Sequence, residues 1–154
     1  MDIPHLLKLF NAHRVKYVVI GATAFPPHGF SRVTLDLDIF IEPTVINAER
    51  ARDALRIFGY DVTDLTIESM LAKKTLFRGY GLESDIHPFV TGVDAFEAVW
   101  RARMYGNIEG VPTNFASLDD LITMKRAAGR GKDLDDLRYL EKIRAIKRKR
   151  KQRK

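Results

Sequence analysis

The chain has 154 residues, a formal net charge of +6 and no cysteine. This length is enough for one domain with a buried core, and the lack of cysteine excludes disulfides and thiolate metal sites. No apolar run approaches the roughly 18 residues of a membrane span. The N-terminus lacks the basic start and small-residue cleavage site of a signal peptide, so the cytoplasm is the expected location and no membrane partner is expected.

A helix and a buried strand are expected first. Apolar residues between Ile3 and His13 have helical spacing, and Asp2 is placed to cap the start of that helix. Residues 17–20, YVVI, are mostly β-branched and end at a glycine, which is typical of a buried strand. The small residues 21–24, GATA, follow, and a backbone with such side chains can approach a ligand closely.

The next expected strand carries carboxylates on one face. Residues 32–41, RVTLDLDIFI, alternate polar and apolar, which is the period of a strand with one wet face. Asp36 and Asp38 therefore project to the same side, about 6.6 Å apart along the chain, together with Arg32 and Thr34. Adjacent carboxylates repel unless a cation lies between them, and Mg²⁺ prefers oxygen ligands and substrate phosphates. After a strand and a small-residue turn, this pattern indicates a divalent-metal site.

The middle of the chain predicts helices, short extended pieces and a hairpin. The helical patterns cover 47–58, 66–74 and 93–105. Short extended pieces are expected at 60–62 and 107–112. Residues 76–88 suggest a hairpin with glycine at the turn, whose second arm carries Asp85 and His87.

The C-terminal region predicts two helices and a basic tail. Ser117 with the following acidic residues is typical of a helix start, and residues 129–131, GRG, separate that helix from a last one over 132–146. Residues 142–154 hold nine Lys and Arg and no acid, and the rest of the chain has 17 basic and 20 acidic residues. Residues 147–154 are expected either to be a disordered, solvated end or to bind RNA phosphates.

The order of helices and strands predicts a single domain over 1–146 of the α/β (α+β) class. A small mixed β-sheet with helices packed around it, followed by C-terminal helices, is the expected architecture.

These motifs resemble the minimal nucleotidyltransferases of the DNA polymerase beta superfamily, near the branch of the abortive-infection toxin nucleotidyltransferases. That family shows a strand, Gly-Gly or Gly-Ser, a short helix and an R-x-T-x-D-x-D strand. The matching positions here are Gly21, Ala22, His28, Gly29, Arg32, Thr34, Asp36, Asp38 and the segment 125–136. The chain departs from the pattern at Ala22, and at Pro26 and Pro27, where proline shortens the expected helix.

The resemblance implies a site. Asp36, Asp38 and Asp85 would be catalytic and would hold two Mg²⁺ or Mn²⁺ ions. The implied nucleotide contacts are Gly21, Ala22, Thr23, Arg32, Thr34, Lys125, Arg130 and Lys132. Asp133 and Asp136 are expected to cap a helix or to pair with these bases. His28 is expected to buttress the turn, and His87 is interpreted as structural.

The resemblance also implies an activity. A nucleoside monophosphate would move from a nucleoside triphosphate such as ATP to a hydroxyl of a tRNA or other RNA, a protein or a small molecule. As in a toxin–antitoxin system, an antitoxin protein would be a partner. The alternative interpretation is a catalytically inactive nucleotide- or RNA-binding module with the same fold, which the departures at Ala22 and at Pro26 and Pro27 motivate.

Overall fold

The computed structural model describes residues 2–31, 34, 36–79 and 81–153. Six strands form one mixed sheet in the order β3-β4-β2-β1-β6-β5, which confirms the predicted fold class. The strands are β1 (Tyr17–Ile20), β2 (Asp36–Ile41), β3 (Thr75–Gly79), β4 (Leu82–His87), β5 (Met104–Ile108) and β6 (Val111–Phe115). β2 pairs antiparallel with β1 and parallel with β4, so these three strands form the centre on which the polar residues lie.

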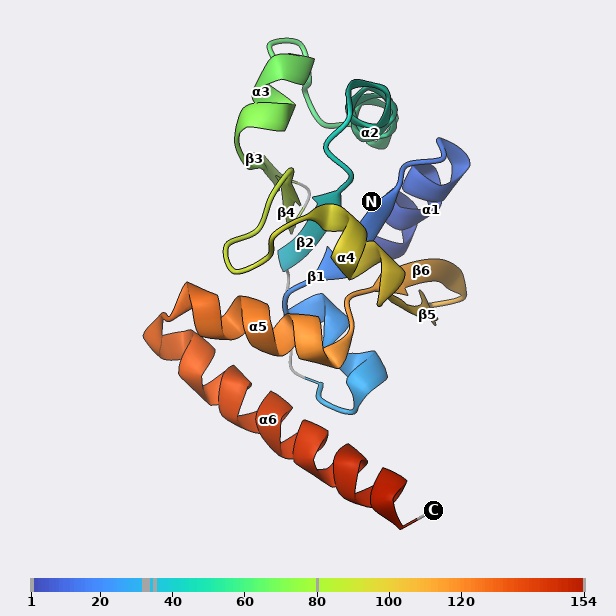
Figure 1. The fold of residues 1–154 in the computed structure, drawn as a ribbon. Helices are drawn as coiled ribbons and strands as arrows, with labels where there is room; N and C mark the ends of the chain where they lie inside the picture. The colour runs from blue at the N-terminus through green and yellow to red at the C-terminus, as the bar shows by residue number, and fades with distance from the viewer. Residues whose placement is uncertain (1, 32–33, 35, 80, 154) are drawn as a thin grey trace.

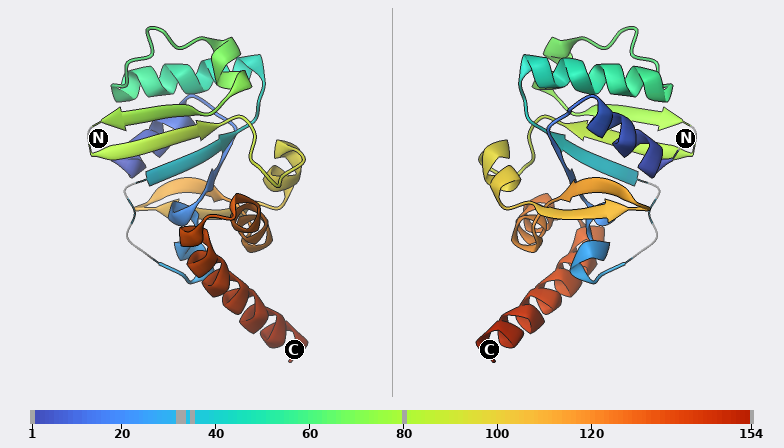
Figure 2. Two further views of the ribbon diagram at one scale, coloured as in Figure 1. Left: turned by 90° about the vertical axis from the view of Figure 1, so that its left-hand side faces the viewer. Right: turned by 90° about the vertical axis from the view of Figure 1, so that its right-hand side faces the viewer.

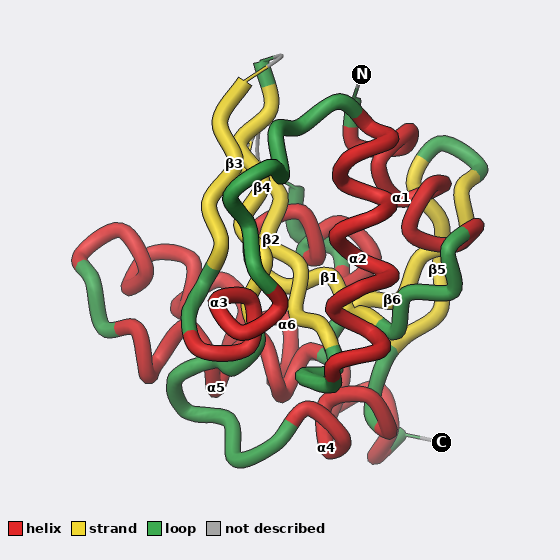
Figure 3. The backbone as a smooth tube through the Cα atoms, turned by 90° about the horizontal axis from the view of Figure 1, so that it is seen from above, coloured by secondary structure: helices red, strands yellow, loops and turns green. Residues whose placement is uncertain are grey.

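Helices cover both faces of this sheet. They are α1 (Ile3–Ala12), α2 (Val45–Phe58), α3 (Ile67–Ala72), α4 (Phe96–Arg101), α5 (Leu118–Ala128) and α6 (Gly131–Gln152), with the short 3₁₀ helices η1 (Ala22–Ala24) and η2 (Pro26–His28). Figure 1 shows α1 and α2 on one side of the sheet and α5 with α6 on the other. Figure 3 shows the same arrangement from above.

Local sequence signals explain where these helices start. The Asp2 carboxylate accepts a hydrogen bond from the backbone N–H of His5 at 3.0 Å, as the predicted cap requires. The Ser117 hydroxyl does the same for the N–H of Asp120 at 3.1 Å. All four residues of β1 are buried, because helices pack on both sides of this central strand.

The expected strand at 60–62 is wrong. The backbone N–H of Tyr60 instead donates to the carbonyl of Leu55 and closes the C-terminal end of α2, so it is not available to a neighbouring strand. Pro26 and Pro27 do shorten the local helix as expected, since this region forms two single-turn 3₁₀ helices.

The predicted helix over 93–105 is too long. The predicted extended piece at 107–112 is extended at both of its ends, which belong to two different strands joined by a turn. The helix is limited to Phe96–Arg101, and residues 104–115 form the β5–β6 hairpin instead. Its turn passes through Glu109 and Gly110, both with positive φ, which is the backbone that a tight hairpin requires. Pairing of β6 with β1 extends the sheet and favours this strand over continued helix.

The basic tail is helical rather than disordered. α6 continues through Gln152, and residues 147–153 are exposed. Lys, Arg and Gln are good helix formers, and basic side chains are favoured at a helix C-terminus, which explains why the helix continues. Figure 2 shows the C-terminal half of α6 extending away from the sheet. Its first half is anchored by Tyr139, which stacks on Phe30 at 5.1 Å between ring centroids.

Among the described residues, no helix combines the length and the apolar character needed to cross a membrane.

Candidate metal and nucleotide site

Two carboxylates and an imidazole meet on neighbouring strands. Asp38 lies on β2, and Asp85 and His87 lie on β4. Asp38 and Asp85 are register partners in the parallel β2–β4 pair, so their side chains leave the sheet on the same side. One ligand atom from each of the three residues lies within 4.8 Å of the others. We call Asp38, Asp85 and His87 the acidic trio.

Neighbouring cations and hydrogen-bond donors balance the trio's charges. His87 Nε2 lies 2.8 Å from Asp38 Oδ1. Asp85 accepts a hydrogen bond from Arg78 Nη1 at 2.8 Å and lies 3.7 Å from Lys74 Nζ. The three side chains are 16 to 28% exposed, which is open enough for an ion or substrate to reach them. The carboxylates of Asp38 and Asp85 therefore already attract donors and cations, and a divalent cation bound to them would take the place of these contacts.

Gly21 brings the end of β1 against Asp38. Its φ is +69°, and a methyl group at its Cα would lie 2.7 Å from Asp38 Oδ2. Only glycine combines this conformation with so close an approach. The sequence predicted that the backbone of the small-residue turn would approach a ligand closely. In the structure the backbone at Gly21 closely approaches the carboxylate of Asp38.

The other small-turn residues have structural partners. Ala22 is only 8% exposed and packs in the core. The Thr23 hydroxyl donates to the carbonyl of Asp36 at 2.9 Å, and the Thr34 hydroxyl accepts from the N–H of Asp36 at 3.1 Å. Phosphate contacts by Ala22, Thr23 and Thr34 stay predictions. Arg32, the remaining implied contact on this strand, lies outside the described residues.

Asp36 is not part of the trio. It is exposed at the start of β2 and lines a separate hollow with Arg78, Gly81 and Glu83. Its register partner on β4 is Glu83, which lies two residues further from His87 than Asp85 does. The structure therefore joins Asp38 and Asp85 as expected, and it brings His87 rather than Asp36 to them. A metal role for Asp36 stays a prediction.

Lys125 belongs to a buried ion-pair cluster. Its Nζ lies 2.9 Å from Asp133 Oδ1 and 3.2 Å from Asp136 Oδ2, and its side chain is 13% exposed. Arg130 donates from Nε to Asp133 Oδ2 at 2.7 Å. Burial raises the pKa of Asp133, but the hydrogen bonds from Arg130 and Lys125 outweigh burial and hold that pKa at about 2. These contacts confirm the expectation that Asp133 and Asp136 pair with the bases, whereas Lys132 is exposed on α6.

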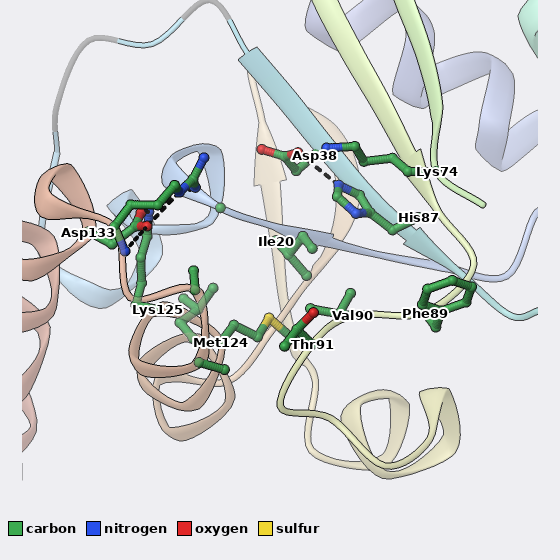
Figure 4. Close-up of a pocket in the computed structure, with 15 residues that line it drawn as sticks. Ile20, Asp38, Lys74, His87, Phe89, Val90, Thr91, Met124, Lys125 and Asp133 are labelled. Atoms are coloured by element: carbon green, nitrogen blue, oxygen red, sulfur yellow. Dashed lines mark hydrogen bonds and ion pairs between the residues drawn. The ribbon is translucent and has the colours of Figure 1, made fainter.

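A cavity of about 580 Å³ separates the trio from this ion-pair cluster. Asp38, His87 and Lys74 line one end, and Lys125 and Asp133 line the other (Figure 4). Arg130, which donates to Asp133, also lines the cavity. The apolar wall between the two ends comes from Ile20, Phe89, Val90, Leu121, Met124, Ala127 and Ala128. Its volume is in the range of small-molecule sites, and its mixed polar and apolar lining suits a ligand with charged and apolar parts.

His28 has the structural role that the sequence predicts. It is buried, and its Nε2 lies 2.9 Å from the backbone carbonyl of Ala116, at the entry to α5. Burial lowers the pKa of His28, so the ring is neutral and donates this hydrogen bond. His28 therefore ties η2 to the chain segment between β6 and α5.

Comparisons with protein-family models and with curated proteins find no match to this chain. The resemblance to nucleotidyltransferases consequently rests on the sequence motifs, and the site rests on its own geometry. His87 is the residue that sequence reasoning undervalued. Its two-residue spacing from Asp85 on one strand face was the available signal.

Proposed function

We propose that this chain is a divalent-metal-dependent nucleotidyltransferase. The observation that carries the proposal is the acidic trio on two adjacent parallel strands, of which Asp38 and His87 line a cavity large enough for a nucleotide. The carboxylate oxygens of Asp38 and Asp85 are suitable ligands for Mg²⁺ or Mn²⁺. The imidazole of His87 is not a preferred ligand of these hard ions, and its contact with Asp38 at 2.8 Å suits it to orient that carboxylate. The strand–glycine–D-x-D arrangement that resembles the family supports the same assignment.

The residues of the cavity divide the work of the reaction. A bound divalent ion would supply charge stabilisation at the transferring phosphate. Asp38 and Asp85 would hold that ion, and Gly21 would let the nucleotide approach them without a side chain in between. Lys74 and Arg130, which line the same cavity and are 47% and 61% exposed, would offset negative charge on the triphosphate. The acceptor hydroxyl would attack the α-phosphorus, and pyrophosphate would leave.

The acceptor we favour is RNA, bound through the basic half of α6. After Glu141 the helix has no acid, and Arg144 is the one basic residue of this half that forms an ion pair among the described residues, with Asp119. Uncompensated Lys and Arg on a helix attract phosphate backbones without reading sequence. A protein or small-molecule hydroxyl would not need this surface.

A catalytically inactive binding module is the second candidate. The observation that favours it is that the trio's carboxylates already have His87, Arg78 and Lys74 as partners, and that Lys125 is neutralised by Asp133 and Asp136. Such a protein would bind nucleotide or RNA without turnover.

Calorimetry followed by a transfer assay separates these candidates. Mn²⁺ and Mg²⁺ are titrated into the protein with a nonhydrolysable nucleoside triphosphate, and four labelled triphosphates are then incubated with protein and total RNA. Metal-dependent binding with label transfer supports the enzyme, and binding without transfer supports the module. Asp38→Asn should lose both metal binding and transfer. Unchanged metal binding in that variant would contradict the metal site.

A further inference from the structure

We propose that Phe89, Val90 and Thr91 form a wall that binds the nucleobase, with the ring of Phe89 as its stacking surface. The inference rests on the proposed function, because it concerns the nucleotide whose phosphates would face the acidic trio. It concerns binding and specificity, and Phe89 is not assigned a role in the chemical step.

The two kinds of lining in the cavity motivate this assignment. Phosphates need cations and a metal. Lys74 and Arg130 supply the cations, and the trio would hold the metal. A purine or pyrimidine has two apolar faces and needs aromatic or aliphatic contacts instead. Phe89, Val90 and Thr91 follow β4 directly and line the cavity together with Met124 (Figure 4).

Phe89 has the exposure that a stacking residue needs. Its side chain is 62% exposed at the edge of the cavity, whereas Phe77 and Phe96 are at most 8% exposed and belong to the core. A ring already covered by the core could not offer a face to a ligand. Pro88 before it is buried, which fixes the point at which the chain leaves the sheet.

The wall is held in place by a turn and by α5. The N–H of Val93 donates to the carbonyl of Val90 at 3.1 Å, and Gly92 has a φ of +90° in the turn that this bond closes. A methyl group on Gly92 would lie 2.6 Å from Ala127 Cβ and 3.4 Å from the carbonyl oxygen of Thr123. The turn therefore lies directly on α5, and Phe89 is presented from an ordered support rather than from a free loop.

The test compares two kinds of probe: tripolyphosphate, which has no base or sugar, and nucleotide analogues, which have both. Calorimetry with Mn²⁺ measures binding of inorganic tripolyphosphate and of the nonhydrolysable α,β-methylene analogues of ATP, GTP, CTP and UTP. Phe89→Ala should weaken the best nucleotide roughly 5- to 150-fold, the range for loss of one base–aromatic stack, and should leave tripolyphosphate unchanged. Phe89→Trp should retain nucleotide affinity, because it keeps an aromatic face.

Two further variants complete the test. Tyr105→Ala removes an aromatic side chain that is 70% exposed on β5 and does not line the cavity, and it should change neither probe. Gly92→Ala should weaken the nucleotide more than tripolyphosphate, because the turn must move off α5.

The outcomes keep this inference distinct from the proposed function. If the protein binds both probes and Phe89→Ala weakens neither, or weakens both equally, the wall assignment is wrong and the proposed function stands. Equal affinity of the unmodified protein for tripolyphosphate and for every nucleotide would also overturn the wall. If neither probe binds with Mn²⁺, the proposed function fails and the wall fails with it.

Discussion

Gly21 and Asp38 lie so close that a methyl group on Gly21 would be 2.7 Å from Asp38 Oδ2. The contact joins the end of β1 to the acidic trio and makes position 21 part of the site without any side chain of its own. Any larger residue must displace the carboxylate or the backbone, because real Cβ atoms do not approach an oxygen so closely.

Gly21→Ala should therefore lower the affinity for Mn²⁺ at least tenfold while the protein stays folded. Gly29→Ala is a matched control, since Gly29 also has positive φ, +97°, but a methyl group there would meet no atom within 4 Å. Gly29→Ala should lose about 1–2 kcal/mol of unfolding free energy, because Gly29 has the left-handed conformation. Gly21→Ala should lose about 1–3 kcal/mol, because the φ of 69° and ψ of −163° at Gly21 are essentially restricted to glycine. Calorimetric titration and chemical denaturation measure the two effects. Equal metal affinity in the two variants would mean that the Gly21–Asp38 contact does not matter for the site.

Arg78→Gln should raise the affinity for Mn²⁺ roughly two- to tenfold. Arg78 Nη1 lies 2.8 Å from Asp85 Oδ1, and a cation so placed competes with a metal for the same oxygen. Arg126→Gln is the control, since Arg126 pairs with Glu141 on α6, away from the trio. Lower affinity in Arg78→Gln would show instead that Arg78 orients Asp85 for the metal.

Strand alternation in the sequence predicted that Asp36 and Asp38 share a face of one strand. That Asp85 would join Asp38 was implied only by the resemblance to nucleotidyltransferases, and the β2–β4 register confirms this pairing. Sequence did not reveal that His87 would reach Asp38, since the β2–β4 register decides which residues meet across strands. Lys125 could not be assigned from sequence either. Its spacing suits a phosphate contact as well as an ion pair, and only the packing of α6 on α5 brings Asp133 and Asp136 to it.

Helix boundaries failed where tertiary contacts compete with local preference. The predicted helix over 93–105 reached into residues 104 and 105, which instead pair with β6 because that completes the sheet. For the basic tail the prediction missed a helix instead of extending one too far. Charge repulsion suggested disorder, whereas intrinsic helix propensity and an already formed α6 extend the helix to Gln152.

Lys125→Met should destabilise the fold by about 3–5 kcal/mol, because it leaves the buried carboxylates of Asp133 and Asp136 without their shared cation. Arg126→Met, on the same helix but 58% exposed, should cost at most about 1 kcal/mol. Urea denaturation at pH 7 measures both. If Lys125→Met keeps full stability and loses only triphosphate affinity, the phosphate role implied by the family resemblance is the correct one.

Folding stability should fall as the pH drops below about 6.5, through His28. Burial lowers the pKa of this ring in the folded state, so below its ordinary pKa the unfolded chain binds a proton that the folded chain excludes. Urea denaturation between pH 5 and 8 should show this loss in the unmodified protein and a flatter profile in His28→Gln, which keeps an N–H donor for the Ala116 carbonyl. Parallel profiles for the two proteins would rule out His28 as the source.

Deleting residues 147–154 should weaken binding of a long RNA and leave the fold intact. The segment contains seven basic residues, and its described part, residues 147–153, is exposed, so no core packing is lost. The slope of log affinity against log salt should shrink by about 0.7 to 0.9 for each phosphate contact removed. Replacing Lys147, Arg148, Lys149, Arg150 and Lys151 with glutamine is the matched control for charge, because glutamine keeps the helix.

The length of the RNA acceptor gives the deletion of residues 147–154 a second readout. Lys147 lies sixteen residues after Gly131, which is about 24 Å of helix at ~1.5 Å per residue, so the basic end of α6 lies far along the helix from the cavity at Arg130. A dinucleotide acceptor could not contact both places, whereas an RNA of about ten or more nucleotides could, at roughly 3.4 Å per phosphate along one strand. Transfer to a dinucleotide should therefore be unaffected by the deletion, and transfer to long RNA should fall. Equal loss for both acceptors would mean that the tail supports the active site itself, and no loss for either would remove RNA binding from α6.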